Sequence, residues 1–257
     1  MRSADNPVRI IARLDVKGPN VVKGIQLEGL RVVGNPNDLA RKYYAEGADE
    51  ILFIDTVASL YGRNNLLDIL AEAAQGVFVP MAVGGGLRNL HDISQTLRAG
   101  ADKVAINTAA VARPQFITEA AHEFGSQCIV LSVHAKRRPA NDGWEALVDN
   151  GREHTGRDVL EWVAEAQERG AGEILLTSVD RDGTRSGFDI KLISAVVSAT
   201  RIPVIAASGA GRTDHVHSLL TACSPDAICC GALFHYGLAT IGDLKRKLIA
   251  SAVPVRP

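Results

Sequence analysis

A repeat at one fixed spacing constrains the fold of this chain more than any other feature of its sequence. The letters GADEIL at residues 47–52 recur as GAGEIL at residues 170–175, and VPMA at residues 79–82 recurs as IPVI at residues 202–205. The spacing is 123 residues in both cases. A unit of about half the chain is too long for a small solenoid repeat and therefore predicts two structurally equivalent halves.

Short apolar runs alternate with longer amphipathic runs along all 257 residues. The short runs are almost continuously apolar, as parallel strands buried on both faces require. Strands are predicted at 10–14, 51–54, 81–83, 103–106, 128–133, 173–179, 204–206 and 227–230. Helices are predicted at 36–45, 66–75, 90–99, 114–124, 159–168, 190–199, 213–222 and 241–250. Pro36 and Pro114 stand near two helix starts, where the missing N–H costs nothing.

Eight strand–helix pairs on one chain of this length favour an α/β fold with a closed sheet, a (β/α)8 TIM barrel built from two pseudo-symmetric half-barrels. A doubly wound open sheet is the alternative, but a repeat with four units per half suits closure better. We expect residues 1–257 to form a single (β/α)8 barrel domain, with halves at about 1–125 and 126–257.

Composition argues against several classes of partner. The net charge is −1 and Lys and Arg are scattered among Asp and Glu, so no basic patch indicates nucleic acid or an anionic membrane. No apolar run reaches transmembrane length and the first residues carry no signal-peptide core, so we expect a cytoplasmic protein. The four cysteines show no metal-type spacing, and His215 and His217 diverge on a helix. We therefore expect neither a metal site nor a cofactor.

In a (β/α)8 barrel the active site lies at the C-terminal ends of the strands. The residues that precede the predicted strands do not share the polar, glycine-rich character of those that follow them, which locates a candidate active site at one end of the barrel. The residues that follow the strands are Asp15, Asp55, Gly84, Gly85, Gly86, Asn107, Thr108, His134, residues 178–183, residues 208–211, Gly231 and Ala232.

Two glycine-rich loops follow the third and seventh predicted strands, and the repeat places Gly86 on Gly209. Glycine lets backbone N–H groups approach a phosphate, assisted by the positive end of the following helix. Two such loops on opposite sides of the barrel mouth would hold a substrate with a phosphate at each end. The alternative is that these glycines only make tight turns between strand and helix. The matched positions favour phosphate binding.

Asp15 and His134 end the first strand of each half and are equivalent under the repeat. A buried carboxyl can act as a general acid or base, and an imidazole titrates near neutral pH. The alternatives are an ion pair of Asp15 with Lys17 or Lys23 and a structural role for His134. The charged run DRDGT at residues 180–184 is either an Asp-Gly turn or a substrate contact, and we favour the contact.

These residues belong to longer runs that resemble one family. The runs are RIIARLDVK at 9–17, VVKG at 21–24, FID at 53–55, VGGG at 83–86, GADKV at 100–104, INT at 106–108, FGSQ at 124–127 and residues 170–187 with LTSVDRDGT at 176–184. The chain resembles the cyclase subunit of imidazole glycerol phosphate synthase in histidine biosynthesis, from Arg9 to about Leu248. The sister isomerase of that pathway shares the barrel and the glycine loops but matches these runs less well.

The resemblance implies a barrel that receives ammonia from a glutaminase partner in a heterodimer. The ammonia would convert a doubly phosphorylated aminoimidazole carboxamide ribonucleotide into imidazole glycerol phosphate and aminoimidazole carboxamide ribonucleotide. The implied catalytic pair is Asp15 and His134. The implied substrate-binding residues are Lys23, Asp55, Gly86, Asn107, Thr108, Thr177, Asp182, Gly183, Ser208, Gly209, Gly231 and Ala232.

At the other end of the barrel, the resemblance implies a charged gate for ammonia and a contact with the glutaminase. The gate would comprise Arg9, Glu50, Lys103 and Glu173, and Asp102 would contact the partner. The residues alone are also compatible with a structural ring of ion pairs that closes the barrel floor, because charged residues at the start of buried strands need partners.

Three positions depart from the family pattern. His134 replaces the second of two catalytic aspartates, Arg13 replaces a small residue of the first strand, and Ala207-Ser208-Gly209 replaces Ser-Gly-Gly. Arg13 points into the barrel like Asp15, because side chains two apart share a face of a strand. A working cyclase with His134 as the second acid–base group is our first hypothesis. The alternatives are a paralogue that uses ammonia to amidinate a surface-polysaccharide sugar, although in those relatives the first aspartate is the one replaced, and a weakened scaffold for the glutaminase.

Overall fold

The structure is a computed structural model that describes residues 7–57, 66–139 and 143–256. Eight parallel strands pair around a closed ring, with β10 paired to both β11 and β7. The predicted (β/α)8 barrel is confirmed, and the open doubly wound sheet is wrong because no edge is left in this ring. The barrel strands are β1 (Arg9–Lys17), β4 (Glu50–Asp55), β5 (Met81–Gly84), β6 (Lys103–Ile106), β7 (Ile129–Arg137), β10 (Glu173–Ser178), β11 (Val204–Ala207) and β12 (Ala227–Cys230).

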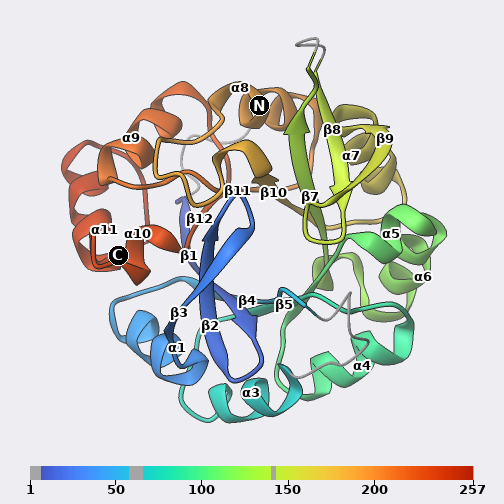
Figure 1. Cartoon of the computed structure of the whole chain (residues 1–257), viewed down its shortest axis with the longest axis horizontal. Helices are drawn as coiled ribbons and strands as arrows, with labels where there is room; N and C mark the ends of the chain where they lie inside the picture. Colours follow the sequence, from blue (N-terminus) through green and yellow to red (C-terminus); the bar gives the residue numbers. More distant parts are fainter. Residues whose placement is uncertain (1–6, 58–65, 140–142, 257) are drawn as a thin grey trace.

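Helices surround this ring of strands (Figure 1). The predicted ones are present as α1 (Pro36–Ala45), α3 (Leu66–Ala73), α4 (Leu90–Arg98), α6 (Gln115–Phe124), α7 (Val159–Glu168), α8 (Ile190–Ala199), α9 (Thr213–Ala222) and α11 (Ile241–Ala250). Side-chain caps define several starts: Asn35 caps α1 ahead of Pro36, Asp158 caps α7, and Thr240 forms a capping box with Asp243 at α11. No described helix is long and apolar enough to cross a lipid bilayer.

The repeat in the sequence is matched by the register of the strands. Ile51 pairs with Met81 between β4 and β5, and Ile174 pairs with Val204 between β10 and β11. Each residue of the second pair lies 123 positions after its counterpart in the first pair. The same four-strand pattern thus occurs twice around the ring, which brings the C-terminal ends of β1 and β7 to equivalent places on the rim.

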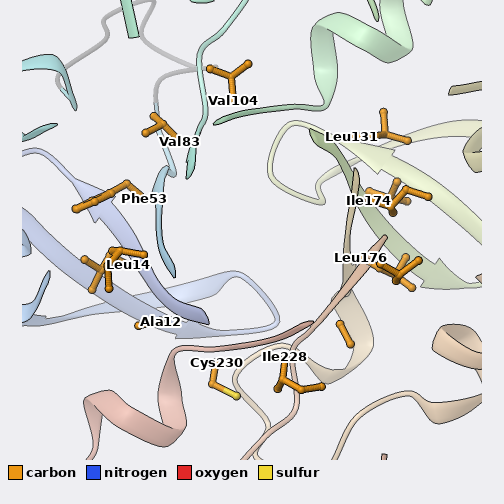
Figure 2. Close-up of a cluster of buried hydrophobic side chains, with 14 of the residues drawn as sticks. Ala12, Leu14, Phe53, Val83, Val104, Leu131, Ile174, Leu176, Ile228 and Cys230 are labelled. Carbon is orange, nitrogen blue, oxygen red and sulfur yellow. The ribbon is translucent and has the colours of Figure 1, made fainter. Parts of the chain in front are cut away.

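Buried side chains form two apolar layers on either side of the strands. The outer layer packs between the strands and the helices, and Figure 2 shows part of it, including Leu14, Phe53 and Leu176. The inner layer fills the barrel and includes Ile11 and Leu175. Adjacent residues of one strand alternate between these layers, so the inward side chains of each strand are fixed by its register.

Two β-hairpins at the barrel mouth were not predicted from the sequence. One follows β1 as β2 (Asn20–Ile25) and β3 (Glu28–Gly34), and the other follows β7 as β8 (Trp144–Val148) and β9 (Glu153–Asp158). β3 and β9 are largely exposed or half-buried and rich in polar residues, so they lack the continuous apolar runs of the barrel strands. In Figure 1 the β2–β3 hairpin, in blue, lies across the ring of strands.

The β2–β3 hairpin is held over the mouth by contacts with the second half. The backbone N–H of Gln26 donates to the carbonyl oxygen of Asp182 at 2.7 Å. Leu27 packs with Leu147 and Val179 in a small separate apolar cluster. The short helices α5 (Thr108–Ala112) and α10 (Ala232–His235) and the 3-10 turns η1 (Ser126–Cys128) and η2 (Val179–Arg181) complete the loops.

Candidate active site

Asp15 and His134 lie at the C-terminal ends of β1 and β7, on the same rim of the barrel. Their strands place both side chains inward, and the exposed fractions are 4% for Asp15 and 7% for His134. The matching register explains this placement, because Ile11 pairs with Glu50 in one half and Val130 with Glu173 in the other. The two candidate catalytic groups are therefore equivalent in position.

Two cations surround the carboxylate of Asp15. Nε of Arg13 donates to Oδ1 at 2.7 Å, and Nζ of Lys23 donates to Oδ2 at 3.1 Å. Burial alone would raise the pKa of Asp15, but the charges of Arg13 and Lys23 outweigh it and hold this pKa well below its usual range. The ion pair with Lys23, one of the sequence-based alternatives, is therefore present, and Arg13 adds a second. At neutral pH Asp15 is a firmly ionised carboxylate.

Lys23 extends this ion pairing to the second half of the barrel. Its ammonium group also donates to both oxygens of Asp182 at 3.1 Å. The hydroxyl of Ser208 donates to Oδ1 of the same carboxylate at 3.0 Å. Arg13, Asp15, Lys23, Asp182 and Ser208 thus form one continuous polar network, which we call the mouth network.

His134 has a different environment. Burial, followed by the nearby charge of Arg13, lowers its pKa to about 4, so the imidazole is neutral at pH 7. Its Nδ1 lies 3.4 Å from Nδ2 of Asn107, which also donates to the carbonyl oxygen of Leu147 at 3.1 Å. A neutral imidazole can accept a proton from a reacting group but is a weak proton donor.

Two cavities of unequal size lie on either side of this centre. The first cavity has a volume of about 380 Å³, and the second has a volume of about 20 Å³. Among the residues predicted from the sequence, the first cavity brings together Asp55, Gly86, Asn107, Thr108 and His134. The second brings together Lys23, Asp182, Gly183, Ser208, Gly209, Gly231 and Ala232, with Arg13 on the same wall.

The remaining predicted residue of the mouth, Thr177, does not line either of these two cavities. Its hydroxyl accepts a hydrogen bond from Nη1 of Arg13 at 3.2 Å. Ser132, two residues before His134 on β7, lines the first cavity and was not singled out in the sequence. The alternation of side chains along a strand could have identified it, because residues 132 and 134 share the inward face.

The glycine loops do make tight turns, which was the alternative to phosphate binding. At Gly85, with φ of +96°, a Cβ atom would lie 2.2 Å from the carbonyl oxygen of Asp55. At Gly209, with φ of +98°, it would lie 2.1 Å from the carbonyl oxygen of Gly187. Close backbone packing thus requires both glycines whether or not a phosphate binds.

Ser208 shows where the two loops differ. It lies 123 positions after Gly85 and keeps the same left-handed backbone, with φ of +80°. L-residues other than Asn and Asp adopt this conformation rarely and at a cost. A non-glycine residue held in this region is often found at functional sites, where the surrounding structure enforces it.

The floor of the barrel is a closed ring of four charged side chains. Glu50 accepts from Nη1 of Arg9 at 2.7 Å and from Nζ of Lys103 at 2.9 Å. Glu173 accepts from Lys103 at 2.9 Å and from Nη2 of Arg9. Burial raises the pKa of Glu50 against the lowering charges of Lys103 and Arg9. These contacts are those of the structural ring considered above, and they lie where a gate would have to be.

Asp102 also lies at this end of the barrel. Its Oδ2 accepts a hydrogen bond from the backbone N–H of Met81 at 2.8 Å, and Asp226 accepts one from Val204 at 2.7 Å in the other half. Both carboxylates therefore cap the first residue of a neighbouring barrel strand. This role accounts for Asp102 without a partner protein.

Comparison with known proteins decides the family. The model of a family described as histidine biosynthesis protein matches residues 9–240. The chain belongs to this family. Three curated relatives carry the name imidazole glycerol phosphate synthase subunit HisF, and the chain is a member of this HisF group, the cyclase subunits.

The similarity to these HisF subunits extends over most of each chain. The protein of Legionella pneumophila is 59% identical over 207 residues, which cover 80% of this chain and 97% of the relative. That of Thermobifida fusca is 49% identical over 253 residues, covering 97% and 98%. That of Nostoc sp. strain PCC 7120 is 45% identical over 250 residues, covering 96% of both. The name describes the relatives as subunits, which implies a partner.

Within residues 7–57, 66–139 and 143–256, no three His, Cys, Asp or Glu side chains are grouped closely enough to hold a metal ion. Cys229 and Cys230 are buried, and burial raises the pKa of the Cys229 thiol to about 12.

Proposed function

We propose that this HisF-type chain performs the cyclase reaction of histidine biosynthesis at the rim formed by β1 and β7. Ammonia would react there with the doubly phosphorylated aminoimidazole carboxamide ribonucleotide, in its phosphoribulosyl form. The products would be imidazole glycerol phosphate and aminoimidazole carboxamide ribonucleotide. The observation that carries this proposal is the position of Asp15 and His134, inward on one rim between the two glycine-loop cavities.

The two cavities suit a substrate with two phosphates. The backbone turns at Gly86 and Gly209 lie on opposite sides of the pair formed by Asp15 and His134, one in each cavity. Thr108 and Ala232 begin the short helices that follow the next strands. The reacting carbons of the substrate would then lie over the centre of the rim, where acid–base groups are placed.

The protonation states assign roles to the two groups. When ammonia adds to a carbonyl carbon, the nitrogen carries one proton too many and the oxygen lacks one. Neutral His134 and ionised Asp15 can both accept the proton from nitrogen. We assign this step to His134, because it opens on the larger cavity whereas both carboxylate oxygens of Asp15 are taken by cations. The imidazolium that forms then returns the proton to the former carbonyl oxygen, which balances the addition.

The partner would be a glutaminase that docks on the opposite end and delivers ammonia through the barrel. Arg9, Glu50, Lys103 and Glu173 close that end, so they would have to separate for ammonia to enter. Above them the barrel interior is lined by apolar residues such as Ile11, Leu52 and Leu175. An apolar lining favours neutral NH₃ over the ammonium ion, because desolvating a charge is costly.

Turnover with an ammonium salt tests this proposal without the partner. The purified chain, the doubly phosphorylated substrate and ammonium chloride at about pH 8.5 are expected to give both products, and Asp15→Asn is expected to reduce the rate by about 10²-fold or more. Arg212→Ala, which removes an exposed arginine outside both cavities, provides the matched control. Absence of product at high ammonium and high enzyme concentration would contradict the proposal.

One observation favours a second candidate, a paralogue that uses ammonia on another substrate such as the acetamido group of a surface-polysaccharide sugar. The three departures from the family pattern are linked to one another. Arg13 and Ser208 both belong to the mouth network, and the charge of Arg13 lowers the pKa of His134. Linked changes of this kind are those expected of a site adapted to a different ligand. His134→Asp tests whether cyclase function is retained: a large gain in cyclase turnover would indicate a decayed cyclase, and a loss would indicate that the imidazole has its own task.

A further inference from the structure

The guanidinium group of Arg13 is buried in the barrel mouth with one nitrogen unused. Only 3% of the residue is exposed. Nε is bonded to Asp15 and Nη1 to Thr177, which lies on β10 across the barrel from β1. Nη2 is buried and has no acceptor within the part of the chain that the structure describes. A buried donor without an acceptor costs about 1–3 kcal/mol, and more on a charged group.

This side chain forms part of the wall of the second cavity. The same wall carries Lys23, Ser208, Gly209 and Gly231. The cavity has room for about one water molecule, with a volume of about 20 Å³, so a larger ligand must displace part of its wall. The side chains that can yield are those of the mouth network that line the cavity and the exposed side chain of Arg185.

The charges of the mouth network are balanced internally. Arg13 and Lys23 supply two positive charges, and Asp15 and Asp182 supply two negative charges. His134 adds none, because its imidazole is neutral at pH 7. An incoming anion must therefore compete with these carboxylates for the cations. Nη2 of Arg13 is a buried donor that it can engage before any existing hydrogen bond breaks, and the exposed Arg185 also lines this cavity.

The second loop differs from the first, and phosphate binding there depends more on a cation such as Arg13. Gly85 in the first loop has no side chain, whereas the equivalent Ser208 carries one that is bonded to Asp182. Gly86 is half-buried whereas its counterpart Gly209 is buried, so the second loop offers less open backbone to a phosphate. Charged side chains have to contribute more to binding on this side.

We propose that Arg13 binds an anionic phosphate oxygen of the substrate through Nη2 in the second cavity, and that this contact draws the guanidinium away from Asp15. The inference rests on the proposed function for the identity of the anion. Arg13 is then a binding residue that also positions and releases Asp15. The carboxylate becomes able to exchange protons only when the substrate is in place.

Calorimetric titration with inorganic phosphate at pH 7 tests the first part of the proposal, the binding of phosphate by Arg13. The wild type is expected to bind two phosphates per chain, one in each cavity. Arg13→Met, which keeps the length of the side chain without its charge, is expected to lose the second site or weaken it by at least about tenfold, which corresponds to about 1.4 kcal/mol. Arg212→Ala is expected to retain both sites.

Arg13→Lys keeps the test decisive if Arg13→Met does not fold. It preserves the charge but not the planar set of donors, and an intermediate phosphate affinity is expected. Unchanged stoichiometry and affinity in a folded Arg13 variant would overturn the proposal. So would a wild type whose single phosphate site is unaffected by either substitution.

The pH dependence of ammonium-driven turnover tests the second part. Besides Arg13, the groups that face Asp15 are Lys23 on β2, Asp182 after β10, His134 on β7, Cys229 on β12 and His235 on α10. In the wild type, the limb that belongs to Asp15 is expected at higher pH in the kcat profile, which reports the enzyme–substrate complex, than in the kcat/KM profile, which reports the free enzyme. In Arg13→Met the two limbs are expected to coincide. An Arg13 that stays paired with Asp15 in the complex would instead give the same limb in both wild-type profiles. A wild type without turnover whose phosphate site still depends on Arg13 would sink the proposed function alone.

Discussion

The two sides of the barrel mouth share one backbone plan but differ in what fills them. The first cavity is open, with a volume of about 380 Å³, and its loop carries Gly85 and Gly86. The second is nearly closed, at about 20 Å³, and its loop carries Ser208 and Gly209. Strand register and turn geometry therefore repeat faithfully, whereas the side chains that contact a ligand do not.

The difference shows that a symmetric barrel backbone does not require a symmetric active site. His134 opens on the first cavity, and Asp15 is enclosed by Arg13 and Lys23 beside the second. The equivalent positions thus hold a neutral base on one side and an ionised carboxylate, held by two cations, on the other. Environment, rather than strand position, separates their pKa values.

The largest effect is expected from Asp15→Asn. The substitution leaves Arg13 and Lys23 without the charge that holds them, and turnover with ammonium is expected to fall by about 10²–10⁴-fold. Steady-state rates measure this change. Asp149→Asn, on the wall of the first cavity away from the mouth network, is expected to cost less. If Asp149→Asn were the more damaging of the two substitutions, the assignment of Asp15 would be wrong.

A comparison of stability at two pH values tests the neutral state of His134. The unfolded imidazole takes up a proton near pH 6.5, whereas the native one, with a pKa of about 4, does not. Stability contributed by this group is therefore present above pH 6.5 and is lost as the pH falls toward 4, by at most about 3 kcal/mol. Urea denaturation should show that His134→Gln loses less stability than the wild type between about pH 7 and about pH 4.5. Equal losses would mean that His134 is charged in the native state.

Gly85→Ser makes the first loop resemble the second. Its Cβ atom would lie 2.2 Å from the carbonyl oxygen of Asp55, at a φ of +96°. The free energy of unfolding is expected to fall by about 2–4 kcal/mol, because the backbone must move as well as adopt a strained conformation. Chemical denaturation checks this value. A variant as stable as the wild type would show that the two loops tolerate side chains equally.

Ser208→Gly is the reverse exchange and has the smallest expected effect. The substitution relieves the strain of an L-residue with a left-handed backbone, which costs about 1–2 kcal/mol. It also removes the hydrogen bond to Asp182 and raises the conformational entropy of the unfolded chain, and both of these lower stability. The net change in stability is expected to stay within about 1 kcal/mol. The same denaturation experiment measures it, and a loss above about 3 kcal/mol would show that the serine hydroxyl is essential to the fold.

The barrel and most of its elements could be predicted because their signals are local. Continuous apolar runs mark β4 and β12, and the helix over Pro36–Ala45 was predicted with its observed bounds. The hairpins β2–β3 and β8–β9 were missed, because β3 and β9 are largely exposed or half-buried and lack that apolar signal. They matter for function, since β2 carries Lys23 to Asp15.

The residues of the site could be predicted from the sequence, but their hydrogen bonds and the sizes of the two cavities could not. The repeat placed Asp15 and His134 at equivalent strand ends, and the inward direction of Arg13 followed from its spacing of two residues from Asp15. Whether the guanidinium would pair with Asp15, reach Thr177 or leave a nitrogen free depends on the distance across the barrel. No local pattern in the sequence encodes that distance, nor the unequal volumes of the two cavities.

A crystal structure with the doubly phosphorylated substrate bound would show whether each cavity holds a phosphate. We predict one phosphate in the cavity at Gly86, the other at Gly209 and Gly231, and the reacting carbons between Asp15 and His134. Arg13 is predicted to contact the second phosphate rather than Asp15. A substrate held in the first cavity alone, with Arg13 still paired to Asp15, would contradict these predictions.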